Sequence, residues 1–278
     1  MADFFFEHET AIRLGSFLGS LAAMGLGEAI APRRRLTIPK AWRWASNLGL
    51  VTLNTLLLRL LFPAATVGMA LSAEARAWGL FNNIEVSPWF AAAISVIALD
   101  LVIYLQHVMF HAVPALWRLH RVHHADLDFD VTTGIRFHPI EILLSMLLKL
   151  AAVVVLGTPA VAVLIFEVVL NTMAMFNHSN VRLPLAVDAA LRRILVTPDM
   201  HRVHHSIEGH EANSNFGFNL SLWDRLFGTY LHAPSAGHEK MTLGIRDFRD
   251  PKQVERLTGM LWLPFLGQVK DYAINCPR

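Results

Sequence analysis

Four long apolar segments limit the folds that this chain of 278 residues can adopt. The segments cover residues 11–31, 47–71, 88–111 and 140–176. A bilayer core about 30 Å thick is crossed by about 20 apolar helical residues. Only 17% of the residues are charged, whereas a soluble domain carries roughly 25%. The sequence therefore predicts an integral membrane protein built from helices.

The fourth segment is too long for a single span and contains a break at its middle. Gly157, Thr158 and Pro159 are typical of a tight turn. Each half of the segment, with about 17 to 18 residues, would form a helix roughly 26 Å long. We therefore expect a helical hairpin over residues 140–176, which either crosses the bilayer or dips into it and returns.

Basic residues predict the orientation of the helices. Residues 32–43 contain five Lys and Arg residues, and such a loop favours the cytoplasmic side of a membrane. Counting spans from this loop brings residue 111, both ends of the hairpin and the polar chain after it to the same side.

The expected architecture is a single membrane-embedded domain over residues 1–278. Its fold class is all-α: a polytopic helical bundle of about three spans plus the hairpin, with a cytoplasmic histidine-rich helical cap. The expected parts are transmembrane helices in residues 11–111, the cap in residues 112–139 and 177–232, and the hairpin in residues 140–176.

Eight histidines occur in three short motifs, and the sequence His-Arg-Val-His-His occurs twice. The motifs contain His107 and His111; His120, His123 and His124; and His201, His204 and His205. Residues three and four apart share a helix face, and imidazole is the commonest neutral ligand of a redox-active metal. One ion does not need eight such ligands. The sequence therefore predicts a site that holds two metal ions about 3 to 4 Å apart.

Six histidines lie outside these motifs. His138 and His178 stand at the two ends of the hairpin, where each either completes a coordination sphere or caps a helix. His210, His232 and His238 are expected in surface loops, and the predicted topology puts His8 on the opposite side of the membrane.

Carboxylates beside the motifs are candidate partners for the second nitrogen of each ligating imidazole, which usually donates to an oxygen. These candidate partners are Asp126, Asp130, Glu141, Asp199 and Glu208. Asp199 follows Pro198 and precedes a predicted helix, so we expect it mainly to cap that helix.

Other motifs limit the chemistry. The sequence has no HExxH motif, which disfavours zinc proteases, and its single cysteine, Cys276, excludes thiolate clusters within the chain. No glycine-rich dinucleotide motif occurs, so electrons must come from outside. The net charge of +2 gives no reason to expect nucleic acid as a partner.

Three classes of function remain open at this point. The first is an oxygenase, because the C–H bonds of a membrane lipid react only with a metal such as iron that activates dioxygen. The second is a zinc-dependent membrane hydrolase, in which the metal activates water. The third is a metal-handling membrane protein, which needs a path of ionisable residues through the membrane. Arg59, Asp100 and Glu167 lie deep in the apolar segments but do not form a continuous ionisable path, which disfavours the metal-handling protein.

Four stretches of sequence resemble a known family. They are WRLHRVHHADLDFDVTTGIRFHPIE, FNHSNVRLP, VTPDMHRVHHS and NFGFNLSLWDRLFGTY. Over residues 99–230 the chain resembles the fatty acid hydroxylase superfamily, which includes the sterol desaturases. The resemblance implies a non-haem di-iron oxidoreductase that uses O2 to hydroxylate or desaturate a lipid, such as a sterol, fatty acyl, isoprenoid or ether lipid. Zinc can replace the two iron ions in a preparation.

The resemblance also implies ligand roles, carried over motif by motif. The implied ligands are His107, His111, His120, His123, His124, His178, His201, His204 and His205, and less directly His138. Some eukaryotic members have a further histidine pair after the hairpin, whereas residues 176–180 contain His178 alone; His138 would compensate.

The resemblance implies partners and a location as well. The expected partners are a membrane lipid as substrate and a separate reductase with a small haem or iron–sulfur carrier as electron donor. The short loops and the lack of a fused haem domain indicate a bacterial-type member, placed in the inner membrane with its active site on the cytoplasmic side.

Overall fold

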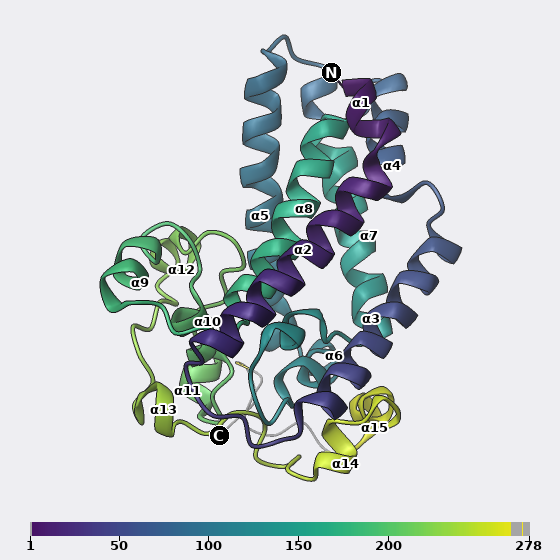
Figure 1. The fold of residues 1–278 in the computed structure, drawn as a ribbon. Helices are drawn as coiled ribbons and strands as arrows, with labels where there is room; N and C mark the ends of the chain where they lie inside the picture. Colours follow the sequence, from purple (N-terminus) through teal and green to yellow (C-terminus); the bar gives the residue numbers. More distant parts are fainter. Residues whose placement is uncertain (1, 268–273, 275–278) are drawn as a thin grey trace.

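The structure is a computed structural model that describes residues 2–267 and residue 274, and these residues form helices joined by loops (Figure 1). Cys276 lies outside the described residues. Within the described part, extended segments pair only in isolated bridges, such as the one between Pro32 and Val181. The expected all-α class is confirmed.

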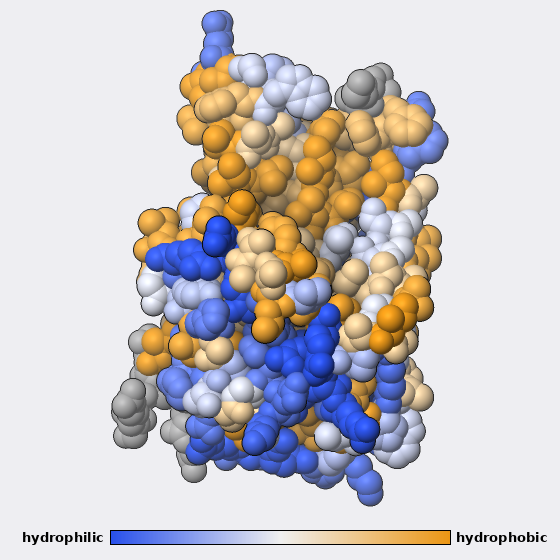
Figure 2. Space-filling model, turned by 60° about the vertical axis from the view of Figure 1, so that its left-hand side comes forward, coloured by the Kyte–Doolittle hydropathy of each residue, from blue (hydrophilic) through white to orange (hydrophobic). Residues whose placement is uncertain are grey.

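Four helical segments are long and apolar enough to cross a membrane. They are Lys40–Asn82, which contains α3 (Lys40–Leu61), α4 (Ala65–Ala75) and the short 3-10 helix η1 (Leu80–Asn82), and the helices α5 (Pro88–Ala112), α7 (Pro139–Leu156) and α8 (Ala160–Asn177). On the face shown in Figure 2, apolar residues predominate in the upper part, and hydrophilic residues are concentrated in the lower part. The protein is therefore an integral membrane protein.

Helix α2 (Glu9–Ile30) occupies the first expected span but is not among these four segments. It is long enough at 22 residues, but Arg13, Glu28 and several Gly and Ser residues lower its mean hydropathy. The helix instead packs diagonally along α8 (Figure 1). Short helix α1 (Ala2–Glu7) precedes it.

The turn between α7 and α8 lies at the predicted break. Gly157 ends α7 with a φ of +66°, in the left-handed region that favours glycine. Its backbone also lies against Gly79, where an added Cβ would approach the Gly157 nitrogen to 2.2 Å. Glycine is therefore required on both sides of this contact.

Ionisable groups deep in the bundle are paired. Glu167 on α8 accepts a hydrogen bond from Thr66 on α4 (2.7 Å) and forms ion pairs with Arg13 (2.7 Å) and Lys149. Asp100 on α5 accepts a hydrogen bond from Trp223 Nε1 (2.8 Å). An unpaired buried charge is costly. Because the partners of Glu167 and Asp100 lie on other helices, these contacts connect the helices to one another. Arg59 is exposed near the end of α3.

Short helices form the cap below the bundle. They are α6 (Pro114–His124), η2 (Val131–Ile135), α9 (Leu185–Leu191), α10 (Pro198–His204), α11 (Gly209–Ala212), α12 (Leu222–Leu226), α13 (Gly237–Lys240), α14 (Pro251–Val254), α15 (Leu257–Trp262) and η3 (Leu263–Phe265). The cap thus extends beyond residue 232, where the sequence analysis ended it.

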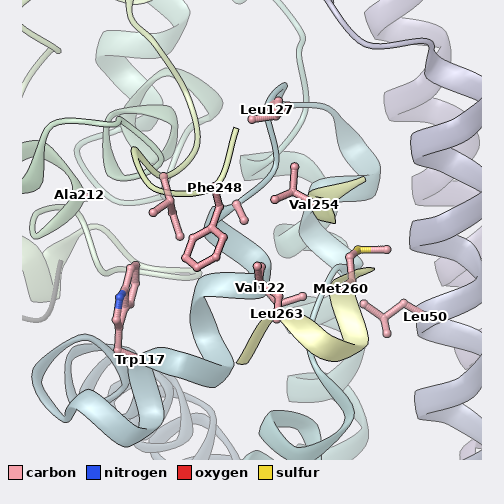
Figure 3. Close-up of a cluster of buried hydrophobic side chains, with 11 residues drawn as sticks. Leu50, Trp117, Val122, Leu127, Ala212, Phe248, Val254, Met260 and Leu263 are labelled. Atoms are coloured by element: carbon pink, nitrogen blue, oxygen red, sulfur yellow. The ribbon is translucent and has the colours of Figure 1, made fainter. Parts of the chain in front are cut away.

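The C-terminal helices support α6 through an apolar cluster (Figure 3). Trp117 and Val122 on α6 belong to this cluster together with Phe248, Val254 and Leu263. All five side chains are at most 7% exposed, so the cluster buries one side of α6 against the C-terminal segments and Leu50 of α3. Burial of each large apolar side chain contributes about 1.5–3 kcal/mol.

A buried ion-pair network connects α3 to the segment after α6. Arg43, which is fully buried, donates to both carboxylate oxygens of Asp126 (2.9 and 2.8 Å) and to Asp130. Arg136 donates to Glu255 at the end of α14 (2.8 Å). The network fixes the loop that follows the first His-Arg-Val-His-His sequence.

Candidate metal centre

Nine histidines gather where the cap meets the membrane helices. The five-histidine group consists of His107, His111, His120, His124 and His204, and the four-histidine group consists of His123, His178, His201 and His205. In each group, one nitrogen from every member lies within 4.8 Å of the others. All nine side chains are buried, at no more than 4% exposed. Each group is therefore a candidate site for one metal ion.

Each His-Arg-Val-His-His sequence divides between the two groups. In the first sequence, His120 and His124 belong to the five-histidine group and His123 belongs to the four-histidine group. In the second sequence, His204 belongs to the five-histidine group, and His201 and His205 belong to the four-histidine group. At 3.6 residues per turn, positions i+3 and i+4 point about 100° apart, on either side of position i. One helix can therefore serve two neighbouring sites, a division that the expectation of a shared face did not include.

The Nε2 atoms in each group face one another at short distances. These distances are 2.9 Å for His107–His204, 3.1 Å for His107–His120, 3.1 Å for His111–His124, 3.0 Å for His123–His178 and 3.0 Å for His178–His201.

Five of the nine opposite ring nitrogens, Nδ1, are bonded to oxygens: those of His107, His111, His120, His178 and His204. His107 Nδ1 lies 2.8 Å from the Phe216 carbonyl, and His204 Nδ1 lies 2.7 Å from the Ser214 carbonyl. His120 Nδ1 lies 2.6 Å from Glu141 Oε1. A carbonyl oxygen only accepts hydrogen bonds, so Nδ1 of His107 and His204 must carry the proton. Their Nε2 atoms are then left with bare lone pairs.

Two bare lone pairs 2.9 Å apart repel each other unless a cation lies between them. Protonation of the neighbouring rings is disfavoured, because burial lowers the pKa of His120 and His178 to about 3. An imidazole nitrogen lies about 2.1 Å from its metal, so two ligands at a right angle are about 3.0 Å apart. The observed 2.9 to 3.1 Å therefore fits a bound metal ion.

His138 lies outside both groups, contrary to the expectation that it completes the ligand set. Its Nδ1 accepts the N–H of Ile140 (3.2 Å), which makes it the N-cap of α7, and its Nε2 bonds the Leu261 carbonyl (3.3 Å). Pro139 begins the helix directly after it, so the ring is used at the helix terminus rather than at the metal centre.

Of the five carboxylates considered, Glu141 contacts an imidazole and the other four bond guanidinium groups. Asp126 and Asp130 bond Arg43, Asp199 bonds Arg33 and Arg202, and Glu208 pairs with Arg246. Their predicted contact with ligand histidines is replaced by charge pairing, which satisfies a buried carboxylate better than a neutral ring.

Asp199 does not cap its helix either. Thr197 is the N-cap of α10 and accepts the N–H of Met200 (3.4 Å), because Pro198 takes the first helical position. The remaining histidines lie outside both groups: His210 pairs with Glu211, His232 contacts Arg192 and Tyr230, His238 lies 3.7 Å from Asp199, and His8 contacts Phe4.

The sequence motifs did not indicate the role of Asp224, which positions two of the clustered histidines. Asp224 on α12 accepts the N–H groups of Phe216 (2.7 Å) and Gly217 (2.8 Å) and the hydroxyl of Thr229 (2.7 Å). It thereby holds the loop whose carbonyl groups bond His107 and His204. A hydrogen bond to a backbone carbonyl leaves no signature in the sequence. The stretch NFGFNLSLWDRLFGTY, which contains Asp224 and resembles the family, was the one signal that could have indicated this loop.

A cavity of about 30 Å³ adjoins the five-histidine group. Its lining consists of Ile103, Gln106, His107, Phe110, His120, Phe137, Glu141 and Phe218. A water molecule needs about 10–15 Å³ of such space, so the cavity holds roughly two water-sized molecules. It gives a small reactant direct access to the rings of His107 and His120.

The model of the fatty acid hydroxylase family matches residues 92–229. This range contains all nine clustered histidines, Glu141 and Asp224. The chain therefore belongs to the fatty acid hydroxylase family, as the resemblance of its motifs predicted.

Several curated proteins are similar to this chain. An ornithine lipid hydroxylase, OlsE, of Rhizobium tropici is 32% identical over 145 residues, covering 52% of this chain and 43% of that protein. An alkylglycerol monooxygenase of Xenopus tropicalis is 27% identical over 228 residues, covering 77% and 48%. A fatty acid hydroxylase, vlmA, of Lecanicillium sp is 31% identical over 157 residues, covering 51% and 42%. The chain thus spans less than half the length of these relatives. No solved structure matches it.

Proposed function

We propose that this protein is an oxygen-dependent membrane oxidoreductase that inserts one oxygen atom into a C–H bond of a lipid. The observation that carries the proposal is the set of nine buried imidazoles in two groups, in which Nε2 atoms face one another at 2.9 to 3.1 Å. In the balanced reaction, the lipid C–H group, O2, two electrons and two protons give the lipid alcohol and water.

The two histidine groups would each hold one ion, and we propose iron. The iron ions would supply the redox chemistry that activates dioxygen, as an all-imidazole donor set permits. Phe216 and Ser214 fix the tautomer of His107 and His204 through their carbonyl groups, and Glu141 orients His120. Preorganised ligands of this kind keep each Nε2 directed at its ion.

The chain offers the lipid an apolar environment and limits the access of water. Phe110, Phe137 and Phe218 line the small cavity beside His107 and His120. The names of the three relatives all describe hydroxylases or monooxygenases, which favours hydroxylation over desaturation here. We further propose that a separate reductase with a small haem or iron–sulfur carrier donates the electrons on the cytoplasmic side of a bacterial inner membrane.

The test is an isotope experiment on purified protein in mild detergent, supplied with iron, a reductant and a lipid extract. With ¹⁸O2, the lipid product should carry one ¹⁸O atom, and His204→Ala should abolish the product. His232→Ala, a histidine outside both groups, is the matched control and should retain activity. Oxygen that derives from labelled water instead would indicate a hydrolase and contradict the proposal.

A further inference from the structure

An apolar groove of about 320 Å³ opens on the surface of the membrane helices, beside the small cavity. Its lining consists of Met109, Phe110, Leu116, Leu144, Leu147 and Leu148, from α5, α6 and α7. No polar side chain lines it. Leu147 and Leu148 are 52% and 37% exposed, on a helix apolar enough to span a membrane, so the groove is open toward lipid rather than toward water.

Phe110 is the one residue that lines both the groove and the cavity. Its side chain is 1% exposed, and its ring centroid lies 5.8 Å from that of His120. The ring therefore stands between the lipid-facing groove and the imidazoles of His107 and His120. Because a Phe side chain moves by rotation about two bonds, it can open this passage without a change in the helices.

We propose that the groove between α5 and α7 binds the alkyl chain of a bilayer lipid and that Phe110 determines how far this chain reaches toward the histidine groups. The occupant must be an alkyl chain, because polar or charged groups would lose hydrogen bonds to water in a fully apolar groove. This inference rests on the proposed function in naming an alkyl chain as the part of the lipid that is oxidised.

The groove and the cavity differ in volume, and this difference gives each a separate role in binding the alkyl chain. The groove is large enough for a segment of chain, whereas the 30 Å³ cavity accepts roughly two water-sized groups. With the Phe110 ring in place, the chain is held in the groove. Rotation of the ring joins the two spaces and admits the carbon that is to be oxidised, so the size of residue 110 selects that carbon.

The test uses photolabelling, which reports binding without activity. The protein is placed in nanodiscs of dioleoylphosphatidylcholine that contain a minor fraction of a phosphatidylcholine with a diazirine near the end of one acyl chain. We expect peptides containing Leu144 and Leu148 to be labelled several-fold more than peptides containing Val155, which is also lipid-exposed on α7. The labelling should be the same in protein stripped of metal by a chelator.

Leu147→Trp fills the mouth of the groove and should lower the labelling of Leu144 several-fold. Val155→Trp, the matched control on the same helix, should leave it unchanged. Uniform labelling along α7, or equal effects of the two substitutions, would overturn the proposal that the groove binds an alkyl chain. Because metal is not needed for the label, this outcome is separate from a failure of the oxygenase.

Phe110→Ala tests the barrier. It should extend labelling to Ile103 and Phe218, which line the cavity, and the milder Phe110→Leu should do so less. If Ile103 and Phe218 are labelled equally in the unaltered protein and in Phe110→Ala, Phe110 does not control the depth of the chain.

Discussion

Several of the proposed ligand imidazoles have an oxygen partner for Nδ1, and at His120 that partner is a carboxylate. Glu141 Oε1 lies 2.6 Å from His120 Nδ1, whereas His107 and His204 use backbone carbonyls that no substitution of a side chain can remove directly. Glu141 is thus the point at which a single substitution tests the role of the second nitrogen.

Glu141→Ala should lower metal affinity by about 10- to 100-fold, the usual cost of removing a residue that orients a ligand. Glu141→Gln keeps an acceptor oxygen and should lose much less. Competition with a chelator measures the affinity. Glu208→Ala is the control, because Glu208 pairs with Arg246 away from the histidines; an effect as large as that of Glu141→Ala would refute the assignment.

The residues that the sequence predicted well are those whose role depends on side-chain type and local spacing. Eight of the nine clustered histidines were named from the HxxxH and HxxHH motifs, whose spacing is set by helix geometry, and His178 was named from its place at the end of the hairpin and from the family resemblance. His138, Asp126, Asp130, Asp199 and Glu208 lie away from the ring nitrogens of the two groups, because proximity in sequence does not reveal a competing guanidinium group or a helix terminus.

At the scale of elements, the loop before α12 links the metal centre to the cap. Asp224 holds the N–H groups of Phe216 and Gly217 (2.7 and 2.8 Å), and the loop's carbonyls in turn hold His107 and His204. Trp223 Nε1 bonds Asp100 on α5. One short helix therefore positions ligands from both α5 and α10.

Asp224→Asn should destabilise the protein by about 1–3 kcal/mol, because its amide group turns a donor toward a buried N–H that needs an acceptor. Hydrogen exchange at the Phe216 and Gly217 amides should accelerate, and thermal stability in detergent should fall. Asp250→Asn, at the exposed N-cap of α14, should cost less. Unchanged exchange at both amides would contradict this account of the loop.

The elements themselves follow from sequence to different degrees. The apolar segments and the Gly157 turn were predictable, because helix length and glycine conformation are local properties. The use of α14, α15 and η3 to support α6 was not predictable. The cluster joins Trp117 and Val122 on α6 to Phe248, Val254 and Leu263, which lie more than a hundred positions later in the chain.

At the scale of the whole molecule, a buried network holds membrane helix and cap together. Arg43 at the start of α3 bonds Asp126 and Asp130, and Arg136 bonds Glu255. Burial alone would raise the pKa of Asp126, but the guanidinium of Arg43 holds it below its usual range. The positive charge of Arg43 therefore offsets the cost of burying the negative charges of Asp126 and Asp130.

Arg43→Ala should destabilise the protein by about 3–5 kcal/mol, the cost of leaving buried carboxylates without a partner. The measurement is the temperature of unfolding in detergent, with Arg35→Ala as control because Arg35 is exposed. Equal melting temperatures for the two variants would show that the network does not connect the bundle to the cap.

The central claim is that the nine histidines hold two neighbouring metal ions, one in each group. The most direct measurement is metal analysis together with Mössbauer spectroscopy on protein expressed with ⁵⁷Fe and purified in mild detergent. The proposed function predicts two iron ions per chain, magnetically coupled, with loss of the coupled signal in His204→Ala. A single ion per chain, or two iron ions without coupling, would contradict the account.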